Sequence, residues 1–326
     1  MPTVDLETQA PHPQVADLLA GILRPDPTGG VPTVDGVRYT TQRLSEILVG
    51  PGEPVLRTWD SNAPSPHGSV PLRWYESPDA ARDSLLVYVH GGGWVAGNRE
   101  THDTASRALA LRTRFIVATV DYTLSPEAPH PQAILEVADV LHHVRSLARE
   151  FGLEIRNLAV AGDSAGGHLL GAALHHLAAS KSSLPDAAVF VYPITDVSLD
   201  YPSYTRFGEG FALTGDRMRW YWEQYLGEDL GQLGDRRRDP YISPLYSPHL
   251  DRFPPSLIIT AGLDVLHDEG EALAERLRQN SVPVEHIDVP GHIHGFLRYR
   301  KVLTDPVDGP DAIMVRIGDF LGKHST

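Results

Sequence analysis

The sequence contains no cysteine, which excludes a disulfide framework, a thiol nucleophile and a cysteine-type zinc site. No apolar stretch approaches the length of a membrane span, and the first ten residues lack the basic and apolar pattern of a signal peptide. Basic residues are also few, because 28 lysines and arginines stand against 42 aspartates and glutamates. The formal net charge of −14 would repel phosphate backbones, so nucleic acid is not an expected partner. We expect a soluble, cytoplasmic protein with no membrane partner.

Alternating strand and helix signals indicate an α/β fold. The 326 residues are 41% hydrophobic and 21% charged, an ordinary globular composition. Helical spacing of apolar residues, as over 134–148 and 266–277, separates the strand signals and predicts a mostly parallel sheet flanked by helices. Two runs, Val55–Trp59 and Leu72–Tyr75, alternate in polarity, as at a sheet edge. Five are short and nearly continuously apolar, as in buried parallel strands; they are Ser84–Val89, Phe115–Val120, Leu158–Ala161, Ala187–Tyr192 and Leu257–Thr260. A further apolar run is Val282–Val289.

Two segments fall outside this alternation. Residues 1–50 carry apolar residues at helical spacing and then a break at Pro25–Pro32. Residues 202–238 are rich in aromatic side chains, and Thr214 is placed there as a helix N-cap. We expect residues 1–50 to form an N-terminal cap segment and residues 51–326 a main domain, with a cap insertion at about 202–238.

The most informative motif is the segment from Gly162 to Gly166, which reads Gly-Asp-Ser-Ala-Gly with Ser164 at its centre. It lies between an apolar run and a helix-like run. A serine on such a sharp strand-to-helix turn projects its hydroxyl clear of the chain, and the helix start supplies free N–H groups and a positive dipole end. The competing interpretation is a glycine-rich turn that holds a serine by chance.

A second motif, the loop His90–Trp94, has three successive glycines after a buried run. Glycines leave backbone N–H groups bare and able to approach a ligand closely, and donors fixed there stabilise charge on a carbonyl oxygen. A phosphate-binding loop would require a lysine or the G-x-G-x-x-G spacing, and neither is present. A flexible glycine linker is the other alternative. The residues alone do not show which two of the three glycines point inward.

A serine nucleophile needs a base, and the base needs an orienting acid. On a strand-to-helix turn of this kind, the chain order is serine, acid, histidine. Asp264 and His294 each follow a buried run, at the carboxyl end of a predicted strand, where open α/β sheets place their sites. Asp268 is a rival acid, but with Glu271 it indicates a helix-capping box. We therefore predict Ser164, Asp264 and His294 as a catalytic triad.

Other polar residues compete for these roles. His292 is only two residues from the predicted base, and Glu269 is close to the predicted acid. The side chain of Asp163, beside the nucleophile, is expected to point away from the imidazole. The histidine pairs at 142–143 and 175–176 lie within predicted helices, where packing or surface roles are favoured over metal binding. No H-E-x-x-H motif occurs, and we expect neither a metal nor a cofactor.

Taken together, the motifs resemble those of the hormone-sensitive-lipase-like family of esterases, which have the α/β-hydrolase fold. The resemblance runs from about Val55 to Leu321 and implies a helical cap over the sheet. Departures are mild; one is His168, where the family commonly has an asparagine. The motifs are His90-Gly91-Gly92-Gly93-Trp94, Asp121-Tyr122-Thr123-Leu124-Ser125-Pro126-Glu127, Gly162-Asp163-Ser164-Ala165-Gly166-Gly167, Asp264-Val265-Leu266-His267-Asp268-Glu269-Gly270 and His294-Gly295-Phe296.

This resemblance implies a serine esterase that hydrolyses short- to medium-chain carboxylic esters through an acyl-enzyme. It assigns the same triad and implies that the backbone N–H groups of Gly92, Gly93 and Ala165 form the oxyanion hole. Family members often form homodimers, so a homodimer is one expected assembly. The partner expected from the chemistry is a small-molecule ester.

Four aromatic residues are predicted to line the substrate pocket, although aromatic side chains at helical spacing are more often internal packing. They are Trp94, Phe211, Trp220 and Trp222. The same triad would also serve an amidase, a lactonase or a deacetylase of a small metabolite. A non-catalytic small-molecule receptor on this scaffold is the alternative from another class, and such a receptor is expected to lack the histidine base. Fold alone does not determine function, so the choice depends on the site residues. His294 is present in its motif, which favours an enzyme over a receptor.

Overall fold

The computed structural model describes residues 10–24 and 31–325, so the N-terminal residues 1–9 and most of the predicted break at 25–32 lie outside the described residues. Within the described part, one sheet has the strand order β1-β2-β4-β3-β5-β6-β7-β8. The predicted mostly parallel sheet of about eight strands is confirmed. The strands are β1 (Arg57–Ala63), β2 (Val70–Glu76), β3 (Ala81–Val89), β4 (Phe115–Val120), β5 (Asn157–Asp163), β6 (Ala187–Val191), β7 (Ser256–Leu263) and β8 (Val284–Ile293).

Burial follows the five nearly continuously apolar runs, whereas the run Val282–Val289 is mostly only half-buried in the edge strand β8. Every residue of β4, β5, β6 and β7 is buried, as expected of strands covered on both faces. β1 is largely exposed and lies at the edge, antiparallel to β2. β2 is not an edge strand, because β4 pairs with its other side, also antiparallel. From β4 to β8 all neighbouring strands are parallel.

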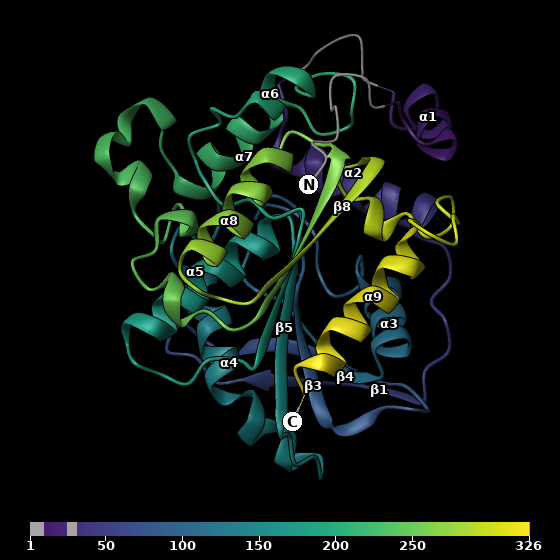
Figure 1. Cartoon of the computed structure of the whole chain (residues 1–326), viewed down its shortest axis with the longest axis vertical. Helices are drawn as coiled ribbons and strands as arrows, with labels where there is room; N and C mark the ends of the chain where they lie inside the picture. Colours follow the sequence, from purple (N-terminus) through teal and green to yellow (C-terminus); the bar gives the residue numbers. More distant parts are fainter. Residues whose placement is uncertain (1–9, 25–30, 326) are drawn as a thin grey trace.

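Helices cover both faces of the twisted sheet, as Figure 1 shows, with α3 and α9 on one face and α4, α5 and α8 on the other. Their inward residues recur at helical spacing; Ile134, Val137, Leu141 and Val144 of α4 are all buried. No described helix combines the length and apolar character of a transmembrane span. The flanking helices are α3 (Asp103–Thr113), α4 (Gln132–Glu150), α5 (Ala165–Ala179), α8 (His267–Gln279) and α9 (Pro310–Lys323).

The order of the strands places two motifs side by side. β3 lies between β4 and β5 in the sheet. From the carboxyl end of β3 the chain crosses to β4 on one side, and β5, the next strand along the chain, lies on the other side of β3. Val89, the last residue of β3, pairs with Gly162 of β5. The glycine loop and the serine turn therefore start from adjacent strand ends, at a switch point where open α/β sheets bind their ligands.

Further helices gather beyond the carboxyl ends of the strands (Figure 1). An Arg38–Glu127 ion pair at 2.7 Å joins α2 to the main domain. The predicted N-cap is confirmed, since Thr214 Oγ1 accepts a hydrogen bond from Arg217 N at 3.1 Å. These segments are α1 (Pro13–Ala20), α2 (Val34–Leu44) and the π-helical turn η2 (Ser45–Val49) from the N-terminal part, and α6 (Pro202–Arg206) and α7 (Gly215–Leu226) from the predicted insertion.

Candidate active site

The backbone at Ser164 has the strained geometry of a sharp turn. Its φ is 54° and its ψ is −122°, a conformation that non-glycine residues rarely adopt. The preceding strand and the following helix leave no room for larger neighbours, because a Cβ on Gly166 would lie 2.0 Å from the carbonyl oxygen of Val89. A hydrogen bond from Ser164 N to Val191 O at 2.9 Å holds the turn against β6. The serine hydroxyl is thereby held at the carboxyl edge of the sheet.

The three predicted triad residues form one hydrogen-bonded chain. Ser164 Oγ lies 2.8 Å from His294 Nε2, and His294 Nδ1 lies 2.7 Å from Asp264 Oδ2. The Asp264 carboxylate is buried and also accepts a hydrogen bond from Leu266 N at 3.1 Å. A carboxylate can only accept, so Nδ1 carries the proton and Nε2 is the acceptor for the serine hydroxyl. This arrangement can remove the hydroxyl proton as the oxygen attacks a carbonyl carbon.

The glycine loop after β3 faces Ser164 across a cavity. Gly91 N donates to Asp163 Oδ1 at 2.8 Å, so this N–H group is already used. Gly92 and Gly93 both line the cavity, with φ of +126° and +61°. A Cβ on Gly92 would lie 2.0 Å from the Ala96 carbonyl oxygen, which explains why this position is glycine. Ala165 is the first residue of α5, where backbone N–H groups have no partner within the helix.

The cavity above Ser164 has a volume of about 150 Å³, and a second cavity of about 220 Å³, called here the outer chamber, shares part of its wall. Both predicted cap segments contribute to its wall, which supports the expected cap without testing the division into domains. From the main domain, the wall also includes Gly92, Gly93, Asp163, Ile194, His294, Gly295, Arg298 and Tyr299. The cap residues in the wall are Thr41, Leu44 and Val49 from the N-terminal part and Leu213, Met218 and Tyr221 from the insertion.

None of the four aromatic residues predicted to line the pocket is part of this wall. Trp94 and Trp222 are fully buried and pack together, with ring centroids 4.4 Å apart. Phe211 packs against Phe207 at 5.5 Å, and Trp220 lies against Tyr221. The prediction of these pocket residues is therefore wrong. The error arises because neighbouring aromatic residues lie on different faces of α7. Trp222 packs against Trp94, whereas Tyr221 lines the cavity.

The rival polar residues Asp163 and His292 have hydrogen-bond partners other than the serine. Asp163 Oδ1 accepts hydrogen bonds from the Tyr88 hydroxyl at 2.7 Å and from Gly91 N at 2.8 Å, so this oxygen is bound to groups other than the imidazole. His292 packs against Phe296, its Nδ1 3.2 Å from Pro290 O. Neither group hydrogen-bonds to the Ser164 hydroxyl.

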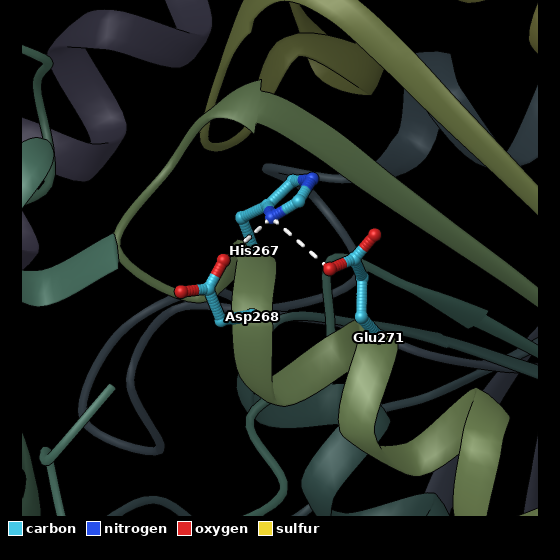
Figure 2. Close-up of side chains that lie close together, drawn as sticks. All are labelled: His267, Asp268 and Glu271. Atoms are coloured by element: carbon cyan, nitrogen blue, oxygen red, sulfur yellow. Dashed lines mark hydrogen bonds and ion pairs between the residues drawn. The ribbon is translucent and has the colours of Figure 1, made fainter. Parts of the chain in front are cut away.

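The first turns of α8 bring a histidine and two carboxylates together, as Figure 2 shows. His267 Nδ1 lies 2.9 Å from Asp268 Oδ1 and 3.9 Å from Glu271 Oε2, and its Nε2 lies 3.4 Å from Asp288 Oδ1. Burial lowers the pKa of His267, but the hydrogen bond to Asp268 and the nearby charge of Asp288 outweigh burial and raise the pKa to about 10. Arg206 also pairs with Asp268 at 2.7 Å, so this carboxylate already has a cationic partner. The cluster is built as ion pairs, and the expectation that no metal is needed stays a prediction.

The predicted capping box at this helix is wrong. α8 begins at His267, and its N-cap Leu266 has no side-chain hydrogen bond. Asp268 lies within the first turn and accepts a hydrogen bond from Ser203 N at 2.8 Å, joining α8 to α6. Its negative charge still interacts favourably with the positive end of the helix dipole, although the side chain does not cap the helix.

Several residues that line the cavity were not predicted from the sequence. Met218 and Tyr221 lie three positions apart on α7, a spacing that marks one helix face, but the aromatic content of the segment obscured it. Arg298 ends the short helical turn η7 (Phe296–Arg298), four residues after His294. Its short distance in sequence from the predicted base was the one feature that could have indicated a place in the cavity wall.

The matched family confirms the fold. A family model described as alpha/beta hydrolase fold matches residues 86–298. The chain belongs to this family. It is 33% identical over 260 residues to an ethyl acetate hydrolase from Pseudomonas putida, covering 78% of this chain and 79% of that protein. An arylesterase from Saccharolobus solfataricus is 32% identical, with 78% and 83% covered.

A solved ester hydrolase from the metagenome of Lake Arreo has the same architecture. It aligns with a TM-score of 0.86 and 31% identity over 96% of this chain and 99% of that one. The resemblance to hormone-sensitive-lipase-like esterases is confirmed, and so is the expected enzyme class, a carboxylic ester hydrolase.

Proposed function

We propose that this α/β hydrolase cleaves short- to medium-chain carboxylic esters with Ser164 as nucleophile, His294 as base and Asp264 as orienting acid. The observation that carries the proposal is the hydrogen-bonded chain from Ser164 Oγ through His294 to Asp264, at 2.8 Å and 2.7 Å. Similar proteins are named as ester hydrolases, which supports the reaction class.

The geometry supports a two-step reaction. Ser164 Oγ attacks the ester carbonyl as His294 Nε2 accepts its proton, and the buried Asp264 carboxylate stabilises the imidazolium. His294 then donates that proton to the departing alcohol, which leaves an acyl-enzyme. Water repeats the sequence, with His294 as base, and releases the acid and the free serine.

Backbone N–H groups stabilise the negative charge on the carbonyl oxygen. Gly92 and Gly93 line the cavity opposite Ser164, and Ala165 offers an N–H at the start of α5. One such donor is worth about 3–4 kcal/mol in the transition state. The inner cavity of about 150 Å³ is comparable to one that accepts a benzene-sized group, which favours a small acyl or alcohol part.

The test is hydrolysis of p-nitrophenyl esters from acetate to laurate by the wild type, Ser164→Ala and the control Ser183→Ala. Ser183 is exposed and remote from the triad in the sequence, so its substitution controls for the loss of a hydroxyl. We expect activity to peak at short chains, to be retained by Ser183→Ala and to fall at least ~10³-fold in Ser164→Ala.

A fluorophosphonate probe separates the remaining outcomes. Labelling of the wild type but not of Ser164→Ala, without turnover of any p-nitrophenyl ester, would indicate an amide, lactone or other narrow substrate for the same triad. If the wild type neither reacts with the probe nor hydrolyses an ester, the catalytic proposal is wrong.

A further inference from the structure

An arginine without a carboxylate partner lies in the wall of the catalytic cavity. Arg298 lines the cavity together with Ser164 and His294. Its Nη2 donates to Ser45 Oγ at 2.8 Å and, at the limit of 3.5 Å, to the Thr101 carbonyl oxygen. Among the described residues, no carboxylate oxygen lies within 4.0 Å of its guanidinium nitrogens.

The hydrogen-bonding capacity of this guanidinium is mostly unused. An arginine has five N–H donors. Nε is buried and has no partner within the described residues, and Nη1 makes no hydrogen bond with them. Arg298 is half-buried, and its unpartnered Nη1 is not among the buried atoms, so this nitrogen is accessible to a ligand. The protein leaves this site cationic although its net charge is −14.

The surrounding wall contains one anion, which is not paired with Arg298. Asp163 is the one carboxylate among the cavity-lining residues, and its Oδ1 is held by Gly91 N and the Tyr88 hydroxyl. A second arginine, Arg217 of α7, lines the outer chamber, and no described carboxylate lies within 4.0 Å of it either. Each of these two cavities is therefore lined by an arginine without a carboxylate partner.

We propose that Arg298 recognises a carboxylate on the substrate, so that the preferred substrates are esters that also carry a free carboxylate. This inference rests on the proposed ester hydrolysis and names its substrate class. Nη1 donates to the substrate carboxylate while Nη2 keeps its bond to Ser45. The carboxylate belongs either to the acyl part, as in a half-ester of a dicarboxylic acid, or to the alcohol part, as in an acylated hydroxy acid.

A purely structural role for Arg298 makes a different prediction. Its bond to Ser45 joins the catalytic histidine's loop to η2, so Arg298 also holds the N-terminal segment in place. Loss of this contact alone would lower the activity on neutral and anionic esters by the same factor. Loss of carboxylate recognition lowers the activity on anionic esters selectively.

The experiment compares matched ester pairs at 0.15 M ionic strength. Mono-p-nitrophenyl glutarate against p-nitrophenyl pentanoate places the charge on the acyl part, and 4-acetoxybenzoate against 4-acetoxybenzamide places it on the alcohol part. The variants are Arg298→Met, Arg298→Lys and the control Lys301→Met. Lys301 is exposed and outside the cavity wall, so the control removes the same unit charge three residues further along.

We expect the wild type to favour the carboxylate ester of at least one pair by about tenfold or more in kcat/KM, a difference of about 1.4 kcal/mol. The pair that shows this preference identifies which side of the ester faces Arg298. Arg298→Met abolishes the preference, Arg298→Lys retains part of it, and Lys301→Met leaves it intact. A wild type without preference in either pair overturns the inference whether or not the variants fold. An Arg298→Met variant that loses activity equally on both members also overturns it.

Binding measurements separate failure of this inference from failure of the proposed reaction. If no ester is hydrolysed, the reaction proposal fails, and calorimetric titration of the wild type and Arg298→Met with 4-acetoxybenzoate and 4-acetoxybenzamide decides the inference. Binding of the carboxylate at least about tenfold tighter, lost in Arg298→Met, upholds it. Equal binding of the two compounds overturns it.

Discussion

Gly91 N donates a hydrogen bond to Asp163 Oδ1 at 2.8 Å, which ties the glycine loop to the residue before Ser164. The same oxygen accepts the Tyr88 hydroxyl, and the Asp163 side chain is buried. Asp163→Ala leaves both donors without a partner, so we expect the free energy of unfolding to fall by about 3 kcal/mol. Because the glycine loop, which carries the proposed oxyanion donors, loses its anchor, kcat should fall at least ~10-fold with a smaller change in KM. Urea denaturation and steady-state kinetics measure the two effects.

Asp163→Asn is the matched control, because its amide oxygen still accepts both hydrogen bonds. We expect this variant to recover more than half of the stability and of kcat lost in Asp163→Ala. Equal losses in the two variants would mean that the negative charge, and not the hydrogen-bonded tie, is what matters.

Asp264 and Asp268 test the assignment of the orienting acid. Asp264→Asn preserves the size of the side chain that contacts His294 but removes its charge and favours the wrong imidazole tautomer. We expect kcat to fall by about 10³–10⁴-fold with KM little changed. Asp268→Asn, which loosens the contact with Arg206, should keep most of the activity. A larger loss of kcat in Asp268→Asn would reverse the assignment.

Much of this site was predictable because the carboxyl ends of parallel strands lie at the same edge of the sheet. Buried parallel strands read as short apolar runs, and polar residues that directly follow such runs meet at one edge of the sheet. Ser164, Asp264 and His294 each lie at such an end, and the structure brings them into hydrogen-bond contact. Thr214 was predictable for a local reason, since an N-cap depends on its own helix alone.

The cavity wall was not predictable in the same way. Trp222 and Tyr221 are neighbours on one helix, and only the tertiary contact with Trp94 decides which of them is buried and which faces the cavity. Arg298 lies outside the strand-end pattern, and its position depends on a contact with Ser45, 253 residues earlier in the chain. Asp268 fitted a local capping pattern, but its partners Ser203 and Arg206 come from another helix.

His267 predicts a dependence of stability on alkaline pH. Its contacts with Asp268 and Asp288 raise its pKa to about 10 in the folded protein, against about 6.5 when unfolded. The folded state therefore holds the proton more tightly, so this stabilisation is complete below pH ~6.5 and is lost as the pH rises to ~10. We expect the wild type to exceed His267→Gln in unfolding free energy by on the order of 3 kcal/mol at pH 6. The difference should shrink steadily toward pH 10.

Urea denaturation of both proteins at each pH unit from 6 to 10 measures this difference. Taking the difference between the proteins removes the contribution of Glu269, whose pKa is raised by burial to about 8 and which titrates over part of the same range. A difference that stays constant from pH 6 to 10 would show that His267 is neutral in the folded protein.

His168 is hydrogen-bonded to Trp94, the last residue of the glycine loop His90–Trp94. The family that the motifs resemble commonly has asparagine at this position. His168 Nδ1 accepts a hydrogen bond from Trp94 Nε1 at 3.2 Å, and its Nε2 donates to the Ile242 carbonyl at 3.0 Å. Burial lowers the pKa of His168 to about 3, which keeps the ring in the neutral form that this pattern requires. His168→Leu leaves a buried donor and a buried acceptor unpaired, at a cost of about 2–4 kcal/mol.

Trp94 directly follows Gly93, so the loss of its hydrogen bond to His168 should also lower kcat for esters. His168→Asn is the informative companion, because an amide offers one acceptor and one donor in place of the two ring nitrogens. We expect His168→Asn to lose less than half of the stability that His168→Leu loses, and to keep most of its kcat. Denaturant unfolding together with p-nitrophenyl acetate kinetics measures both. If the asparagine variant is as unstable as the leucine variant, the amide does not reach both partners, and the packing of the imidazole ring against Trp94 and Trp222 outweighs its hydrogen bonds.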